Sequence, residues 1–180
     1  MGENNMRMET FTYSKSEALD RKSLTGIYDK YNPMLFRYAY RLLGDQDTAE
    51  ECVAETFSRF LNSLRGRPEG PDNVQAYLYR VAHNWITDYY RRQPPTESLD
   101  PDLHVDPQSN PTTLVAQNAE DERMRCALVQ LPQEQRQVIV LRFLEEHSHE
   151  EVASIMGKTV EATRAMQYRA LSSLRKMLLD

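Results

Sequence analysis

The chain has 180 residues with a hydrophobic share of 40%, enough for one domain or two small ones, each with its own core. It carries 22 Lys and Arg against 27 Asp and Glu, a net charge of −5, which excludes a histone-like protein that binds nucleic acid by bulk positive charge. Any contact with DNA therefore has to be local. The acidity is concentrated in residues 93–122, which contain seven acidic side chains and no Lys or Arg.

No apolar run approaches the roughly 20 residues of a membrane span, and the polar N-terminus lacks the apolar stretch of a signal peptide. We therefore expect a cytoplasmic protein without membrane insertion. Cys52 and Cys126 lack the spacing of a zinc site, so we expect no metal and predict that both are small buried side chains. The sequence shows neither a nucleophilic side chain spaced to pair with a general base nor a glycine-rich loop that could bind phosphate. We therefore expect neither an enzyme nor a cofactor.

Apolar residues recur every three or four positions and glycine is scarce, which predicts an all-helical fold. Residues 1–23 show no sustained period and are predicted to be a flexible tail. A first helix is expected from Leu24 to a C-terminal cap at Gly44, with Pro33 inside it.

The second predicted helix spans 47–64 and begins at a capping box made by Asp47 and Glu50. Asp47, Glu51 and Glu55 recur every four residues, so three carboxylates share one stripe nearly opposite the apolar side. Like charges at this spacing cost a few tenths of a kcal/mol each in an isolated helix. The stripe is either a solvated surface or the binding face for a basic partner, which would remove that repulsion. We call the acidic side chains of this helix the acidic face, which consists of Asp47, Glu50, Glu51 and Glu55.

After a turn rich in proline and glycine at 65–73, the third predicted helix covers 74–92. Residues 77–92 hold five aromatic side chains and three arginines, a combination that suits single-stranded DNA because bases stack on rings and phosphates pair with guanidinium groups. Trp85 and Tyr89 lie on the apolar stripe and are expected in the core. The candidate contacts are Arg65, Arg67, Asn73, Tyr79, Arg80, His83, Asn84, Tyr90, Arg91 and Arg92.

Residues 93–110 combine four prolines with four acids and are predicted to form a flexible acidic linker. The sequence thus predicts two small helical domains, 24–92 and 111–180, on either side of it. The helices expected in the second domain cover about 111–130, 132–144, 149–156 and 160–180.

The segment from Ser148 to Arg169 has the spacing of a helix-turn-helix. Ser148 and Glu151 form a capping box, and Gly157 supplies the positive backbone angle of the turn. The N-terminal amides and exposed side chains of the second helix suit phosphates and base edges of duplex DNA, whereas an ordinary helical hairpin is the alternative. The candidate contacts are Lys158, Thr159, Arg164, Gln167, Tyr168 and Arg169.

Together, the order and spacing of these motifs resemble the extracytoplasmic-function (group IV) sigma factors of the sigma-70 family of bacterial RNA polymerase. The segments that carry the resemblance are 47–57, 76–84, 88–92, Leu131-Pro132 and the helix-turn-helix ending at Leu171. Two positions depart from the family pattern. Ala54 stands where a glutamine is usual, and Ala165-Met166-Gln167 replaces the common Ser-Arg-Leu.

The resemblance implies a sigma factor that recruits core polymerase to specific promoters, melts the minus-ten element and initiates transcription. It implies that the acidic face binds the basic coiled coil of the beta-prime subunit. It also implies that the 65–73 turn and third helix open the minus-ten element and hold a flipped base, while Lys158 to Arg169 read the minus-thirty-five element. The implied partners are the beta-prime and beta subunits of core polymerase, promoter DNA and an anti-sigma factor. The 93–110 linker, which reaches at most about 60 Å, would tie the two promoter-binding domains together.

Two other functions remain open on the sequence. A one-component helix-turn-helix regulator would bind DNA without polymerase, with 24–92 as its ligand or dimer domain, but it leaves the aromatic and basic helix unexplained. A helical adaptor or anti-sigma-type interaction protein would dock a partner on its acidic helix, but it leaves the basic face of 158–176 unused.

Overall fold

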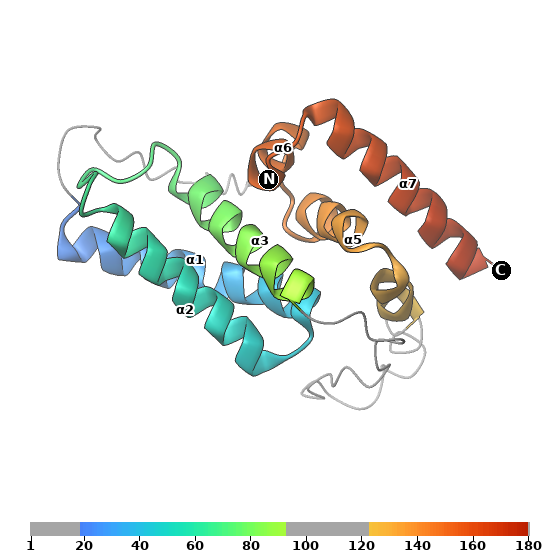
Figure 1. The fold of residues 1–180 in the computed structure, drawn as a ribbon, viewed down its shortest axis with the longest axis horizontal. Coiled ribbons are helices and arrows are strands. Elements are labelled where there is room, and N and C mark those ends of the chain that lie inside the picture. The colour runs from blue at the N-terminus through green and yellow to red at the C-terminus, as the bar shows by residue number, and fades with distance from the viewer. Residues whose placement is uncertain (1–18, 93–122, 180) are drawn as a thin grey trace, which may run out of the picture.

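The computed structural model describes residues 19–92 and 123–179, and every regular element in these ranges is a helix, as predicted. The predicted linker, most of the predicted tail and the start of the fourth predicted helix lie outside the described residues. None of the described helices is long and apolar enough to cross a membrane. The elements are α1 (Arg21–Leu43), α2 (Gln46–Ser63), α3 (Val74–Arg92), a helical segment at 123–130, α5 (Gln133–Ile139), the π-helical turn η1 (Val140–Leu144), α6 (His149–Met156) and α7 (Val160–Leu179) (Figure 1).

The first helix begins three residues before the predicted start at Leu24, because Asp20 caps it. The Oδ1 atom of Asp20 accepts a hydrogen bond from the Ser23 amide at 2.8 Å, which satisfies one of the free donors of the first turn. At the other end Gly44 adopts a φ of 74°, the left-handed cap that was predicted. The helix continues through Pro33.

The second helix begins at Gln46 with Asp45 as its N-cap, so the predicted capping box of Asp47 and Glu50 is wrong. Asp45 has the extended backbone of an N-cap, and its Oδ2 atom accepts from the Thr48 amide at 2.8 Å. Asp47 lies in the first turn instead, where its negative charge interacts favourably with the positive end of the helix dipole. Glu50 accepts a hydrogen bond from Gln46 at 2.9 Å.

The helices α1, α2 and α3 pack around one apolar core, and α3 has the predicted bounds. Its start is fixed by Asn73, whose Oδ1 atom accepts from the Ala76 amide at 2.9 Å. The largest fully buried side chains of this core are Ile27, Leu35, Tyr38, Phe60, Leu78, Tyr79 and Ile86.

In the C-terminal half, the predicted helix 132–144 divides into α5 and η1. The backbone hydrogen bonds of η1 span more residues than those of an α-helix. The amide of Glu145 donates to the carbonyl oxygen of Val140, and the amide of His147 donates to that of Leu141. Glu146 follows with a φ of 58°, which reverses the chain toward α6. A separate small core joins the 123–130 segment, α5 and α7 through Ala127, Leu131, Ile139, Ala170 and Leu174.

The predicted helix-turn-helix is confirmed in α6 and α7. Ser148 and Glu151 form both bonds of the capping box, at 2.7 and 3.1 Å, and Gly157 makes the left-handed turn with a φ of 63°. The hydroxyl of Thr159 caps α7 by accepting from the Ala162 amide at 3.1 Å.

The two halves of the described chain share a core, which the sequence did not predict. The apolar cluster of α1 to α3 continues into Val138, Leu141, Val152, Ile155 and Met166 of the C-terminal half. As a result α3 lies between α2 and α6 and contacts both (Figure 1).

Candidate functional site

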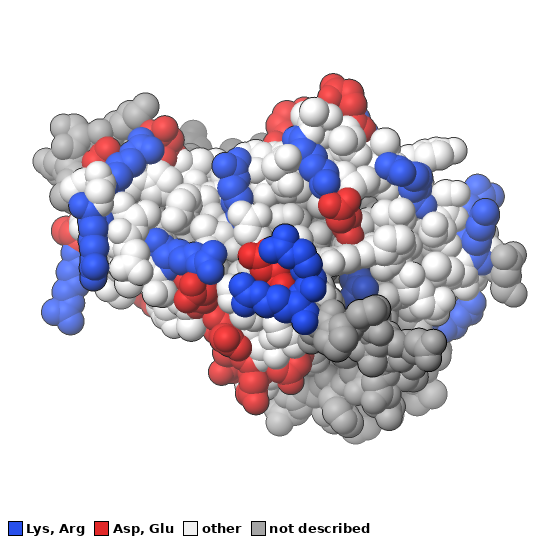
Figure 2. Space-filling model, viewed as in Figure 1, with Lys and Arg blue, Asp and Glu red and all other residues white. Residues whose placement is uncertain are grey.

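The acidic face lies on the outer side of α2, where Asp47, Glu50 and Glu51 are exposed and Glu55 is half-buried. Asp and Glu side chains gather over the N-terminal part of this helix (Figure 2). Glu55 accepts from Arg59 one turn later, at 2.7 Å, whereas Asp47 and Glu51 make no hydrogen bond or ion pair within the described residues. The face is therefore only partly neutralised within its own helix.

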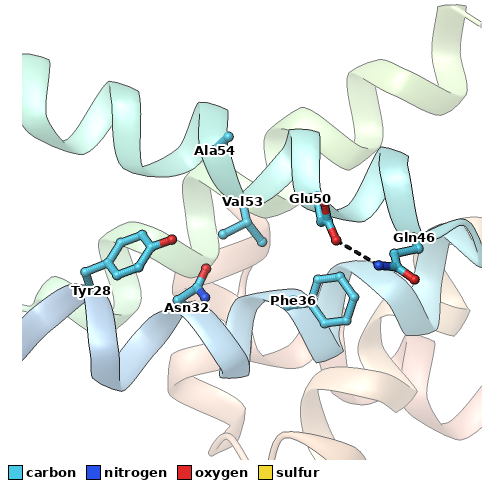
Figure 3. A pocket seen from close by; sticks show the side chains of 7 residues that line it. All are labelled: Tyr28, Asn32, Phe36, Gln46, Glu50, Val53 and Ala54. Carbon is cyan, nitrogen blue, oxygen red and sulfur yellow. Dashed lines mark hydrogen bonds between the residues drawn. The ribbon is translucent and has the colours of Figure 1, made fainter.

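A groove of about 520 Å³ runs beside the acidic face between α1 and α2 (Figure 3). Its lining residues are Tyr28, Asn32, Phe36, Gln46, Glu50, Val53 and Ala54. Glu50 belongs to both the groove and the acidic face, so a partner that meets the carboxylates also meets a recess lined by both apolar and polar side chains. The sequence did not reveal this groove because its walls come from two helices and depend on how those helices pack.

The turn before α3 is held by charged and backbone contacts. Arg67 bonds both Glu69 and Asp72, each at 3.1 Å. Gly70 has a φ of 75°, and a Cβ there would come within 3.0 Å of Leu19. Of the predicted nucleic-acid contacts in this turn, Arg65 and Arg67 are exposed, and the exposed Asn73 uses its side-chain oxygen to cap α3.

Two predicted contacts on α3, Tyr79 and His83, are buried at 0% and 6% exposure, so the expectation that they are accessible is wrong for this conformation. The C-terminal half covers them: the Tyr79 hydroxyl donates to Glu145 at 2.9 Å, and α6 packs along the helix. Burial raises the pKa of Tyr79 well above its usual value. Burial also lowers the pKa of His83 to about 4, so its ring is neutral at pH 7.

The remaining predicted contacts on α3 divide into exposed and engaged side chains. Asn84, Arg91 and Arg92 are exposed, and Lys and Arg side chains gather at the C-terminal end of the helix (Figure 2). Arg80 is also exposed, but its guanidinium donates to Ser154 of α6. The Tyr90 hydroxyl donates to the carbonyl of Leu42 at the end of α1.

Trp85 and Tyr89 are half-buried rather than in the core, which corrects the expectation from the apolar stripe. Their rings stack at 5.4 Å with an interplanar angle of 11°. A stacked, partly exposed aromatic pair offers a platform on which an unpaired base can stack. Sequence reasoning missed this pair because helical periodicity alone does not show how much of a stripe a neighbouring element covers.

The helix-turn-helix presents Arg164, Tyr168 and Arg169 on the exposed side of α7. Lys and Arg side chains are spaced along this helix in Figure 2. Lys158 pairs with Glu134 at 2.9 Å, and the half-buried Gln167 lies closer to the core. Thr159 is exposed, and its hydroxyl caps α7, so this oxygen is already engaged by the backbone at the start of the helix.

Within the described residues no group of three or more His, Cys, Asp or Glu could hold a metal ion. Cys52 is buried, and burial raises the pKa of its thiol to about 12. Cys126 is exposed, so the prediction that both cysteines are buried is wrong for the second one.

Sequence comparison places two known families on the chain. Residues 27–95 match Sigma-70 region 2, and residues 127–176 match Sigma-70, region 4. The chain is 31% identical over 147 residues to the ECF RNA polymerase sigma factor EcfG of Rhodopseudomonas palustris, covering 81% of this chain and 80% of that protein. It is 28% identical over 172 residues to the ECF RNA polymerase sigma factor BldN of Streptomyces coelicolor, covering 92% of this chain but 64% of BldN.

Two solved structures that share the fold of this chain are protein complexes. The sigma factor RpoE in complex with the anti-sigma factor NepR, from Bartonella quintana, matches with a TM-score of 0.67 and 22% identity over 87% of this chain and 97% of that one. CnrH in complex with the cytosolic domain of CnrY matches with a TM-score of 0.65 and 22% identity, over 88% and 89%. At this level of identity the two structures support the fold alone.

Proposed function

We propose that this chain, which belongs to the extracytoplasmic-function sigma factors of the sigma-70 family, directs core RNA polymerase to its promoters through three separate surfaces. One observation carries the proposal. An acidic helix and an aromatic, arginine-rich helix share the N-terminal unit, and a helix-turn-helix forms the C-terminal unit. The protein makes and breaks no covalent bond itself, because the chemistry of transcription belongs to the polymerase, and it works in the cytoplasm beside the chromosome.

The first surface is the acidic face, which we assign to the basic coiled coil of the beta-prime subunit. Asp47 and Glu51 are exposed and make no ion pair within the described residues, so a basic partner would neutralise them. The adjoining groove between α1 and α2 gives the same partner a recess lined by both apolar and polar side chains. The small side chain of Ala54 at its wall leaves room for a larger partner side chain.

The second surface, assigned to the minus-ten element, consists of the 65–73 turn and the exposed part of α3. Arg65, Arg91 and Arg92 supply positive charge for phosphates. The stacked rings of Trp85 and Tyr89 supply a platform for a base that has left the duplex.

The third surface, assigned to the minus-thirty-five element, is the exposed side of α7 with the turn before it. Arg164 and Arg169 suit base edges and phosphates in the major groove. The 93–110 linker lies outside the described residues and would join the two DNA-binding units through the polymerase.

An anti-sigma factor is the partner expected to control the chain. The sigma factor RpoE, which shares the fold of this chain, is bound to the anti-sigma factor NepR. A one-component regulator or an adaptor is not favoured, because the matches to sigma factors extend over both halves of the chain.

The acidic face is tested by titrating fluorescently labelled protein with core polymerase in the absence of DNA. The double variant Glu51→Lys with Glu55→Lys should bind core at least tenfold more weakly, because attraction to the basic coiled coil becomes repulsion. Glu146→Lys with Glu150→Lys is the matched control, since it makes the same charge change four residues apart in the C-terminal half. Equal affinity of the two double variants for core would remove the acidic face from the mechanism.

A further inference from the structure

One side of α7 carries four exposed side chains at helical spacing, which we call the outer face. They are Glu161, Arg164, Ala165 and Tyr168. Because the last three lie three, four and seven residues after the first, all four share one side of the helix. The opposite side is buried and consists of Thr163, Met166, Ala170 and Leu174. The outer face therefore points directly away from the core.

The charged side chains of the outer face are not engaged by the rest of the described protein. Glu161 and Arg164 make no hydrogen bond or ion pair within the described residues. Two other basic groups of the helix-turn-helix differ from them in this respect. Lys158 pairs with Glu134 at 2.9 Å, and Arg169 Nε donates to a backbone carbonyl of α7 at 3.3 Å. The outer face thus keeps one carboxylate and one guanidinium for an external partner.

The carboxylate of Glu161 restricts what can bind to this face. A carboxylate repels phosphates, so on DNA it is favourable only beside a hydrogen-bond donor of a base. In the major groove cytosine presents only its N4 amino group, whereas adenine presents its N6 amino group next to the N7 acceptor. Guanine presents two acceptors, and thymine presents an acceptor and a methyl group. Cytosine is therefore the base that Glu161 fits best.

The next two turns of the outer face carry different chemistry. The guanidinium of Arg164 matches guanine, because it can donate to O6 and N7 at the same time. Tyr168 is 77% exposed, and the small side chain of Ala165 beside it leaves room for the ring to approach a base. An apolar ring favours thymine, whose C5-methyl group is the apolar feature of the major groove.

The length of the outer face sets how many base pairs it can cover. From Glu161 to Tyr168 the helix rises about 10.5 Å, at about 1.5 Å per residue. Base pairs stack about 3.4 Å apart, so the face covers about four of them. The helix runs along one edge of the molecule (Figure 1), and the face occupies its N-terminal half, the part of a recognition helix that meets base edges.

We propose that Glu161 is a specificity-determining residue of the helix-turn-helix, which selects a cytosine through its N4 amino group. Arg164 selects a guanine and Tyr168 a thymine in the same short stretch of duplex. The proposal rests on the function assigned above and adds to it the bases that α7 reads.

The test selects duplexes from a library with a randomised central segment. The full-length chain is immobilised and incubated with the library without polymerase, at low salt, where weak duplex binding becomes measurable. The unsubstituted chain should enrich cytosine at one position at least fivefold over each other base. Glu161→Gln should change the preference at that position to adenine, because an amide can accept from N6 and donate to N7.

The other positions of the selected sequence should stay unchanged in the Glu161→Gln variant. Glu150→Gln is the matched control, since it removes the same charge at an exposed position of α6, and it should keep the cytosine. Arg164→Ala should lose the preference for guanine and also keep the cytosine.

A second measurement isolates the ring of Tyr168. The selected thymine is replaced by deoxyuridine, which lacks the C5-methyl group, and both duplexes are titrated with the full-length chain. The replacement should weaken binding at least threefold for the unsubstituted chain and for Tyr168→Phe, which keeps the ring. It should have no effect on the affinity of Tyr168→Ala.

Identical base preferences of Glu161→Gln and the unsubstituted chain would overturn the proposal, as would a selection without any preferred base. A deoxyuridine effect that persists in Tyr168→Ala would overturn the assignment of thymine. The selection needs no polymerase. A chain that selects these bases but adds no start site to core polymerase would therefore refute the proposed function and leave the base assignments standing.

Discussion

Lys158 Nζ lies 2.9 Å from Glu134 Oε1, so the basic side chain of the helix-turn-helix turn is paired with a carboxylate of α5. The side chains are 30% and 58% exposed, and a pair this accessible to water contributes at most about 1 kcal/mol to stability. A DNA phosphate can therefore compete with Glu134 for Lys158 at low cost. The pairing orients the lysine beside the start of α7 before DNA arrives.

Substitution of this pair should change duplex affinity in opposite directions. Lys158→Ala should weaken binding of holoenzyme to different promoter sequences by a similar factor and reduce the slope of log affinity against log salt by about 0.9, as expected for one lost phosphate contact. Glu134→Gln should strengthen binding about two- to threefold because it frees the lysine. Filter binding over a series of salt concentrations measures both, and an unchanged salt slope for Lys158→Ala would mean that this lysine contacts no phosphate.

The capping box at the start of α6 should contribute measurably to the stability of the C-terminal half. Ser148→Ala removes the acceptor of the Glu151 amide, bonded at 3.1 Å, and should lower the free energy of unfolding by about 1 kcal/mol. Ser172→Ala, at an exposed position within α7, is the matched control and should leave stability nearly unchanged or raise it slightly. Urea denaturation followed by circular dichroism compares them; similar unfolding midpoints would show that the box adds nothing.

Gly157 and Gly26 should respond oppositely to alanine. A Cβ at either position meets nothing within 4 Å, so only backbone conformation separates them. Gly157 has a φ of 63°, and Gly157→Ala should destabilise the protein by about 1 to 2 kcal/mol because a side chain disfavours that region. Gly26→Ala within α1 should stabilise by about 0.5 to 1 kcal/mol. Thermal unfolding of both variants checks the signs, and destabilisation of the same size at both glycines would contradict the conformational explanation.

Lowering the pH should reduce the free energy of unfolding, because His83 is held neutral in the folded protein. Burial holds the pKa of this ring at about 4 in the folded state, whereas an unfolded histidine titrates near 6.5. As pH falls through 6.5 the unfolded chain gains a proton that the folded chain does not, so the free energy of unfolding decreases. From this group alone the loss is about 2 kcal/mol at pH 5.

His147, whose pKa is also lowered mainly by burial, acts in the same direction, so the contribution of His83 has to be isolated by substitution. The charges of Glu134 and Lys158 act on the pKa of His83 in opposite directions, and the Tyr38 hydroxyl lies 3.5 Å from its Nδ1 atom. Urea titrations at pH 7.5 and 5.0 should show that His83→Gln loses about 2 kcal/mol less than the unsubstituted chain. The same loss in both proteins would mean that His83 is not held neutral by the fold.

Local signals in the sequence predicted most of the helices. The bounds of α3, the glycine caps at Gly44 and Gly157, and the capping box of Ser148 with Glu151 all depend on residues within one or two turns of one another. The start of α2 was misplaced because Asp45 and Asp47 are equally good acceptors, and only the extended backbone at Asp45 makes it the cap.

The errors at the candidate site have a different cause, namely contacts between distant segments. Tyr79 lies outside the predicted apolar stripe, yet it is buried because Glu145, 66 residues later, approaches it from η1. Trp85 lies on that stripe and is only half-buried, because helical periodicity does not show where a covering element ends. The groove between α1 and α2 could not be predicted either, because it depends on how two separate helices pack.

The most direct test of the account is transcription in vitro from purified components. Core polymerase is incubated with this chain and with fragmented genomic DNA of its source organism, and the 5′ ends of the transcripts are sequenced. We predict start sites that appear only when the chain is added, share upstream elements near positions −10 and −35, and disappear with the Glu51→Lys, Glu55→Lys variant. If the chain adds no start site to those of core polymerase alone, it does not act as a sigma factor.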